Sequence, residues 1–215
     1  MTEKKMLIAP SVLGADFANL ERELESVSTA DYIHVDIMDG IFVPNISIGI
    51  PVVKCMKKVT DVPLDVHLMI DRPERYVTRF AEAGADILTI HVESSEKTEQ
   101  TLEQIKADGV IPAVSVKPST PVETVFPYLD KVKMVLIMTV EPGFGGQKMI
   151  VSCLEKCIQL KKEIEKRGLD ILIEIDGGVT KENMALVKNS CVDIAVVGSA
   201  IFNEKDRKKI IEELR

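Results

Sequence analysis

The amino-acid sequence predicts a single-domain α/β protein, a (β/α)8 TIM barrel that spans residues 1–215. Short runs rich in β-branched residues alternate with segments of helical periodicity along the whole chain, which indicates parallel βαβ units. Eight such units follow one another at a spacing of about 25 residues, and no linker or low-complexity segment interrupts them. The length of 215 residues suits a closed barrel, and the absence of G-x-G-x-x-G after the first strand disfavours an open nucleotide-binding sheet.

The expected strands and helices are assigned in chain order from these runs. The strands are expected at Leu7–Pro10, Tyr32–Met38, Leu64–Met69, Ile87–Val92, Ile111–Val116, Met134–Val140, Ile171–Asp176 and Ile194–Gly198. Apolar residues at helical spacing place helices, among others, at Phe17–Val27, Pro73–Ala83, Lys97–Asp108, Ile150–Lys166 and Lys181–Lys188. The segment "STPVETVFPYLD" after the fifth strand has room only for a short helix.

Composition disfavours several classes of protein. With 46% hydrophobic and 28% charged residues, the chain can bury a core and is not a disordered composition. Its net charge of -7 argues against a nucleic-acid or membrane partner. No apolar run is long enough to span a bilayer, and the N-terminus lacks the apolar region of a signal peptide. The four cysteines show no CxxC spacing, which predicts a reduced, cytoplasmic protein. Cys153 and Cys157 lie at i and i+4 of an expected helix and are interpreted as core thiols.

The three histidines of the chain all lie in the later part of an expected strand. They are His34, His67 and His91. A single histidine in a strand is usually a structural residue, but the C-terminal ends of the strands are where such barrels carry their chemistry. Three histidines at one end of the barrel therefore indicate a functional site.

Carboxylates accompany these histidines. Side chains two positions apart in a strand point to one face, which places together His34 with Asp36, Asp65 with His67, and Glu174 with Asp176. Two imidazoles and two carboxylates from separate strand ends can converge on one point, and this donor set suits Zn²⁺, Fe²⁺, Mn²⁺ or Co²⁺. A buried network of ion pairs is the alternative, although buried charge is costly without strong compensation. Asp65 is interpreted as a structural partner rather than a ligand.

Three glycine-containing loops follow the last three strands. They read "EPGFGGQ" (141–147), "DGGV" (176–179) and "VGSAIF" (197–202). Glycine lets backbone N–H groups approach an anion closely, and the loops after strands seven and eight are the usual phosphate site of this architecture. Because no lysine or arginine occurs in these loops before Lys148, backbone dipoles are expected to bind the phosphate. Turn chemistry explains each loop singly; together the loops favour phosphate binding.

Three methionines, Met38, Met69 and Met138, share strand parity with residues near the expected mouth of the barrel. Two interpretations of them stay open. They fill the core, as methionines in strands usually do, or they form an apolar cap beside the reacting carbon of a substrate.

Several motifs resemble those of the ribulose-phosphate 3-epimerase family, in order across essentially the whole chain. They are "APSVLGADFANL", "HVDIMDGIFVPN", "DVHLMI", "MTVEPGFGGQ" and "EIDGGV". The resemblance implies a barrel of the ribulose-phosphate-binding type and an isomerase that inverts C3 of a ketose phosphate. The implied reaction converts D-ribulose 5-phosphate to D-xylulose 5-phosphate in the pentose phosphate pathway.

The resemblance also implies a cofactor and roles for individual residues. It implies one divalent ion per subunit, Zn²⁺ before Fe²⁺, Mn²⁺ or Co²⁺, with the ligands His34, Asp36, His67 and Asp176. Asp36 and Asp176 double as the acid/base pair that moves the C3 proton through a metal-stabilised enediolate. The substrate-binding residues implied are Ser11, His67, Gly143, Phe144, Gly145, Gly146, Gly177, Gly178, Gly198 and Ser199. Barrels often associate, so a homo-oligomer is expected.

Departures from the family pattern lie near the mouth of the barrel and leave the sugar open. Many members have histidine in place of Ile41, and many bacterial members have asparagine in place of Lys117 and Glu141. An allulose-6-phosphate 3-epimerase is therefore the nearest alternative. Lys117 and Glu141 either pair across the rim or stay two solvated charges.

Two more distant alternatives remain. A phosphosugar lyase or decarboxylase of related type carries D-x-K-x-x-D on strand three, where this chain has "DVHLMI" with His67 in the lysine position. A non-catalytic binding barrel is the other alternative, and it would not require paired acids that converge with histidines.

Overall fold

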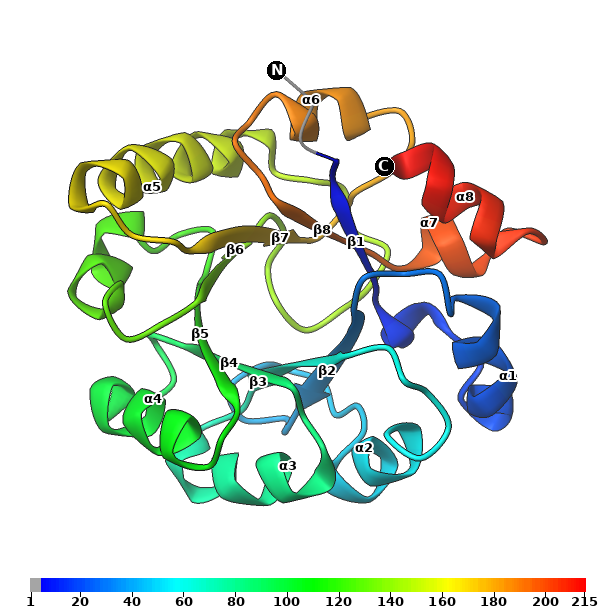
Figure 1. Cartoon of the computed structure of the whole chain (residues 1–215), viewed down its shortest axis with the longest axis horizontal. Helices are drawn as coiled ribbons and strands as arrows, with labels where there is room; N and C mark the ends of the chain where they lie inside the picture. The colour runs from blue at the N-terminus through cyan, green and yellow to red at the C-terminus, as the bar shows by residue number, and fades with distance from the viewer. Residues whose placement is uncertain (1–4) are drawn as a thin grey trace.

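The computed structural model describes residues 5–215 as an eight-stranded parallel sheet curled into a barrel, with the helices outside it (Figure 1). The hydrogen-bonded strand order runs from β1 through β8, β7, β6, β5, β4 and β3 to β2. At the seam between β1 and β2, an isolated bridge joins Ser11 to His34. The predicted (β/α)8 barrel is confirmed.

Each strand lies where the sequence predicts it, and only some of the ends differ. The strands are β1 (Leu7–Pro10), β2 (Ile33–Met38), β3 (Leu64–Met69), β4 (Ile87–His91), β5 (Ile111–Val116), β6 (Met134–Met138), β7 (Leu172–Asp176) and β8 (Ile194–Val197). The largest difference is in β6, which was expected to reach Val140. It ends earlier because the carbonyl of Thr139 accepts a hydrogen bond from the N–H of Ile150, in the following loop.

The helices surround the strands and keep their predicted order. They are α1 (Leu20–Ser26), α2 (Ile50–Met56), α3 (Val77–Ala83), α4 (Thr98–Ala107), α5 (Leu154–Arg167), α6 (Met184–Lys188), α7 (Ser199–Phe202) and α8 (Arg207–Leu214). Short 3-10 helices η2 (Phe17–Asn19) and η5 (Val151–Cys153) form the first turns of two predicted helices. No helix within residues 5–215 has both the length and the apolar character needed to cross a membrane.

Two further predicted helices differ from a continuous α-helix. The helix expected at Pro73–Ala83 is interrupted at Tyr76, whose N–H bonds to the carbonyl of Pro73 three residues back, as in a 3-10 turn. The segment after β5 forms the 3-10 helix η4 (Val122–Tyr128). It contains Pro127, which lacks the N–H that an α-helix would use.

The apolar core lies mainly between the strands and the helices. Strand residues such as Val35 and Val66 point outward into this layer and pack with the helices. Cys153 and Cys157 are buried in the same layer, as predicted, and burial raises the pKa of the Cys157 thiol to about 12. The opposite faces of the strands point into the barrel, and this inner volume is where polar side chains are buried.

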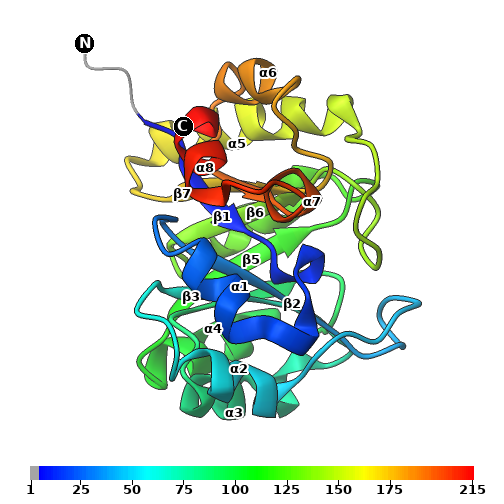
Figure 2. The ribbon, with the colours of Figure 1, turned by 90° about the vertical axis from the view of Figure 1, so that its right-hand side faces the viewer.

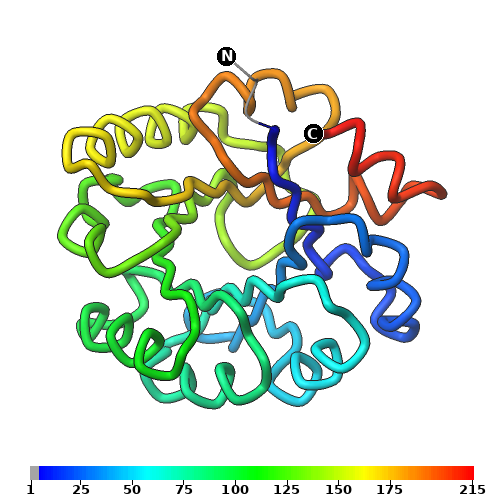
Figure 3. Tube along the Cα trace, in the orientation of Figure 1, coloured from blue at the N-terminus to red at the C-terminus, as the bar shows by residue number. Residues whose placement is uncertain are grey.

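The register of the strands brings the predicted site residues together at one end of the barrel. Asp36 on β2 pairs with His67 on β3, and Met38 pairs with Met69. The loops after β2 and β6 project from the same side of the barrel in Figure 2. In Figure 3 the chain between β6 and α5 crosses the middle of the ring. This side is the C-terminal face, where barrels of this kind hold their sites.

Candidate active site

A cavity of about 900 Å³ opens at the C-terminal face of the barrel. Its lining includes both predicted acid/base residues, Ser11, the three methionines and the glycines of all three loops. Of the predicted site residues, only His34 and His67 do not line it, since both are completely buried. The arrangement is therefore a buried cluster of ionisable side chains below an open cavity.

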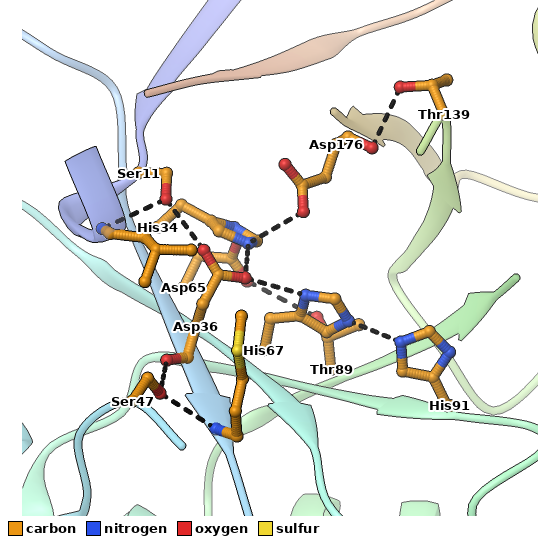
Figure 4. A network of polar contacts seen from close by, with 12 residues as sticks. Ser11, His34, Asp36, Ser47, Asp65, His67, Thr89, His91, Thr139 and Asp176 are labelled. Atoms are coloured by element: carbon orange, nitrogen blue, oxygen red, sulfur yellow. Dashed lines mark hydrogen bonds and ion pairs between the residues drawn. The ribbon is translucent and has the colours of Figure 1, made fainter. Parts of the chain in front are cut away.

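Asp36 is the centre of this cluster (Figure 4). Its Oδ1 lies 3.3 Å from Nε2 of His34 and 3.3 Å from Nδ1 of His67, while its Oδ2 accepts a hydrogen bond of 2.8 Å from Oγ of Ser11. Burial opposes the charge of Asp36, but the positive charge of His34 and the close approach of both imidazoles hold its pKa well below the ordinary value. Asp36 is therefore a carboxylate that faces two imidazoles.

Asp176 completes the cluster from β7. Its Oδ2 lies 3.9 Å from Nε2 of His34, and its side chain is 16% exposed where it borders the cavity. Burial, with the negative charge of Asp36 in second place, raises the pKa of Asp176 to about 6. The backbone around it is held because Thr139 donates hydrogen bonds to the Asp176 carbonyl from both its N–H and its hydroxyl. The two aspartates thus reach the cluster from different strands and hold protons with different strength.

The four side chains fit a metal ion. One ligand atom from each of His34, Asp36, His67 and Asp176 lies within 4.8 Å of all the others. Nε2 of His34 is buried and has no hydrogen-bond partner within residues 5–215. Burial works against a charge on His34, yet Asp36 and Asp65 outweigh it and raise the His34 pKa well above its ordinary value. The cluster therefore favours a cation at this point, and two nitrogens with two oxygens suit a first-row transition ion.

Asp65 lies on the far side of His34 from the cluster. Its Oδ2 is 2.5 Å from Nδ1 of His34, which leaves Nε2 of the ring to face Asp36 and Asp176. Glu174 is fully buried beside these two residues, and neither of its oxygens has a hydrogen-bond partner in the described chain. Burial, and then the charge of Asp65, raises the pKa of Glu174 well above its ordinary value.

The glycine loops line the other part of the cavity. Within residues 5–215, no hydrogen bond is donated by the N–H groups of Gly146, Gly177, Gly178, Gly198 and Ser199. Gly178 has φ +67° and an added Cβ would lie 2.3 Å from the Met149 nitrogen, so the loop after β7 closes only with glycine there. Five unpaired donors at one end of a cavity can hold the oxygens of an anion.

The three predicted methionines line the cavity and are nearly completely buried. Met38 and Met69 pack with Val43 in one apolar cluster, and Met138 packs with Leu136 in another. They therefore both fill the inner barrel and provide an apolar surface to the cavity, so neither interpretation excludes the other.

The two charged residues that depart from the family pattern, Lys117 and Glu141, do not pair with each other. No ion pair within residues 5–215 joins Lys117 to Glu141; instead, Nζ of Lys117 lies 3.8 Å from the centre of the Phe42 ring. Glu141 is exposed, and so is 77% of Ile41 in the loop after β2. The rim pair between Lys117 and Glu141 is therefore absent.

Sequence reasoning counted His91 among the histidines of the site without giving it a specific role, and it did not consider Glu93. Nε2 of His91 lies 2.9 Å from Nε2 of His67, and Nδ1 of His91 lies 3.1 Å from Oε2 of Glu93. The signal was present in the sequence, because Glu93 follows His91 by two positions as Asp36 follows His34.

Comparisons with known proteins show what this chain is similar to. The profile of the family described as "Ribulose-phosphate 3 epimerase family" matches residues 7–202. Ribulose-phosphate 3-epimerase of Bacillus subtilis (strain 168) is 49% identical over 211 residues, or 97% of each chain. The enzyme of that name from Helicobacter pylori (strain J99 / ATCC 700824) is 42% identical over 98% of this chain and 97% of its own. A solved 3-hexulose-6-phosphate synthase superposes with a TM-score of 0.70 at 17% identity over 98% of this chain and 97% of its own, a similarity of fold alone.

Proposed function

The chain belongs to the ribulose-phosphate 3-epimerase family, and from this we propose that it converts D-ribulose 5-phosphate to D-xylulose 5-phosphate by inversion at C3. It is an isomerase of the epimerase class. The observation that carries the proposal is the buried cluster of His34, Asp36, His67 and Asp176 beside a cavity with unpaired amides. D-allulose 6-phosphate is not favoured as the substrate, because the similar curated proteins are named for ribulose phosphate.

The proposal includes one divalent ion per subunit, held by the four side chains of the cluster. Zn²⁺ suits this set best, and Fe²⁺, Mn²⁺ and Co²⁺ accept the same donors. When bound, such an ion supplies Lewis-acid chemistry, which polarises the C2 carbonyl and favours the negative charge of an enediolate.

Asp36 and Asp176 are the proposed proton carriers. The carboxylate of one removes the C3 proton from one face of the sugar, and the other, which holds a proton, delivers it to the opposite face. Their approach to Nε2 of His34 from two different strands, β2 and β7, supports this division (Figure 4). Ser11 donates to Asp36 and therefore fixes one of its oxygens, so that the other faces the histidines. Ser11 would also meet the substrate, and the three methionines would cover its reacting carbon with an apolar surface. A substrate contact of His67 stays a prediction, because this side chain is buried and does not line the cavity.

The phosphate of the substrate is proposed to bind the glycine loops, formed by Gly143, Phe144, Gly145, Gly146, Gly177, Gly178, Gly198 and Ser199. Free backbone N–H groups support this assignment, and Lys148 also lines the cavity. The acidic protein can therefore hold an anion through local dipoles despite its net charge of -7.

Replacement of Gly198 by leucine tests the phosphate end. A Cβ at Gly198 lies 3.9 Å from Cβ of Ser11, so a methyl group fits while a longer side chain enters the cavity. Because hydrogen bonds to a charged group contribute about 1.5–3 kcal/mol, we expect KM to rise about 10- to 100-fold with metal content unchanged. Gly198→Ala is the matched control. An unchanged KM in Gly198→Leu, or abolished phosphate binding in Lys117→Ala, contradicts the assignment.

Two further parts of the proposal concern setting and assembly. All four cysteines are free, and Cys55 and Cys191 are exposed, which supports a reducing cytoplasmic location.

The exposed apolar side chains of Ile41 and Ile46 support association into a homo-oligomer. Sedimentation of the purified protein as a monomer at micromolar concentration would contradict the oligomer.

A coupled assay on metal-analysed protein tests the substrate. We expect turnover of D-ribulose 5-phosphate with a kcat/KM well above that for D-allulose 6-phosphate. The reverse preference would assign the chain to the second sugar, and no turnover of either by metal-loaded protein would refute the epimerase proposal.

A further inference from the structure

A line of polar contacts leads away from the metal cluster across three strands. Nε2 of the completely buried His67 contacts Nε2 of His91, which is also completely buried, at 2.9 Å (Figure 4). Nδ1 of His91 contacts Oε2 of Glu93 at 3.1 Å, and Oε1 of Glu93 accepts a hydrogen bond of 2.8 Å from the backbone N–H of Lys117. Glu93, with its side chain 21% exposed, is the outer end of this line.

The contacts fix the direction in which each hydrogen bond is donated. Burial opposes the charge of Glu93, but the hydrogen bond and charge of His91, together with the Lys117 N–H, hold the Glu93 pKa at about 2, so the side chain only accepts. Nδ1 of His91 must then carry a proton. In a neutral imidazole this leaves a lone pair on Nε2, which accepts a hydrogen bond from the N–H at Nε2 of His67. Nδ1 of His67, the atom 3.3 Å from Asp36, is therefore left with its lone pair.

We propose that Glu93 is a positioning residue which, through His91, sets the tautomer of His67 and so presents the lone pair of His67 Nδ1 to the metal. The inference rests on the proposed metal site but not on the identity of the sugar. In this arrangement, the tautomer of each ligand histidine is selected by a carboxylate. For His34 that carboxylate is Asp65 in direct contact, and for His67 it is Glu93 through one intervening ring.

The aromatic packing around His91 supports a fixed orientation of the ring. The ring of His91 has two aromatic neighbours. The centre of the Phe42 ring lies 4.9 Å from the centre of the His91 ring, and the centre of the His67 ring also lies 4.9 Å away, at an interplanar angle of 30°. Lys117, whose Nζ covers Phe42 and whose N–H holds Glu93, joins the packing to the hydrogen-bonded line. The ring of His91 therefore has little freedom to choose other partners.

The substitution Glu93→Gln keeps the size of the side chain but should reverse the direction in which the hydrogen bonds between Glu93, His91 and His67 are donated. The N–H of Lys117 requires a carbonyl oxygen opposite it, so the amide NH₂ of the variant faces His91 and donates. Nδ1 of His91 then accepts, its Nε2 carries the proton, and His67 moves its proton to Nδ1. Asp36 then accepts a hydrogen bond from this N–H, which stands at the place where the metal needs the lone pair.

The first measurement is long-range ¹H–¹⁵N correlation NMR on Zn²⁺-loaded wild-type protein, in which three histidines give few ring signals to assign. We expect His91 to be protonated on Nδ1 and unprotonated on Nε2. A proton on Nε2 of His91 in the wild type would overturn the proposal whether or not any variant folds. In folded, metal-free Glu93→Gln protein we expect His91 to be protonated on Nε2.

The second measurement is Zn²⁺ affinity by competition with a chromophoric chelator. Loss of a residue that orients a metal ligand typically weakens metal binding about 10- to 100-fold, and we expect this for Glu93→Gln. The matched control is Glu96→Gln, an exposed glutamate of the same loop, which should bind Zn²⁺ as the wild type does. Equal affinities for the two variants would refute the role of Glu93. Neither measurement uses a sugar, so a failed epimerase assay leaves this inference standing.

Discussion

Replacement of Asp176 by asparagine is expected to lower the epimerisation rate by at least about 10²-fold. General acid–base catalysis usually contributes about 10²- to 10⁴-fold to a rate, so the loss can reach the upper end of that range. Asparagine keeps the size of the side chain and one oxygen that can reach the metal, but it removes the proton carrier. Asp36→Asn should have a loss of the same order. Steady-state rates with both epimers, on protein of known metal content, measure the effect.

Isotope exchange separates proton transfer from metal binding at Asp176. In D₂O the wild type should place deuterium at C3 of the epimerised product, because the proton comes from a group that exchanges with solvent. The Asp176→Asn variant should still exchange the C3 proton of the epimer that presents it to Asp36, without inversion. Asp36→Asn should show the same exchange with the opposite epimer.

A matched control for this experiment is Asp170→Asn, which changes an exposed aspartate just before β7. It should retain wild-type rates and exchange. An Asp176→Asn protein that keeps its metal and epimerises at nearly the wild-type rate would refute the assignment of the two proton carriers.

Removal of the metal is expected to abolish epimerisation. Two carboxylates and two imidazoles whose ligand atoms lie within 4.8 Å form a site that favours a cation, and the proposed reaction needs a positive charge near the developing enediolate. Dialysis against a strong chelator should remove the activity, and Zn²⁺, Co²⁺, Mn²⁺ or Fe²⁺ should restore it at one equivalent per subunit. Mass spectrometry of the metal content and the coupled assay measure the two quantities together.

The control for metal removal is parallel dialysis without chelator, followed by the same addition of metal. The unfolding temperature should also fall on removal and recover on addition, because an ion that binds only the folded state stabilises it by mass action, about 2.7 kcal/mol at 100 times its dissociation constant. Full activity in protein shown to be free of metal would refute the metal-assisted mechanism.

The sequence by itself determined the architecture and predicted which side chains converge at one end of it. Alternation of strand-like and helix-like segments depends on local side-chain chemistry, so it predicted eight units whose strand ends differ from the observed ones by two residues at most. The two-residue period of a strand placed Asp36 on the face of His34. The C-terminal ends of parallel strands meet at one face, so the convergence of ligands followed from the fold class.

Only the tertiary structure decided which atoms of these side chains face one another. The register between β2, β3 and β4 brings Asp36 beside His67, and His67 within hydrogen-bond distance of His91. The same packing places Lys117 over Phe42 and not beside Glu141, because loops from different units meet there. Such distances depend on how strands stagger around the closed barrel, and periodicity along one chain carries no information about that stagger.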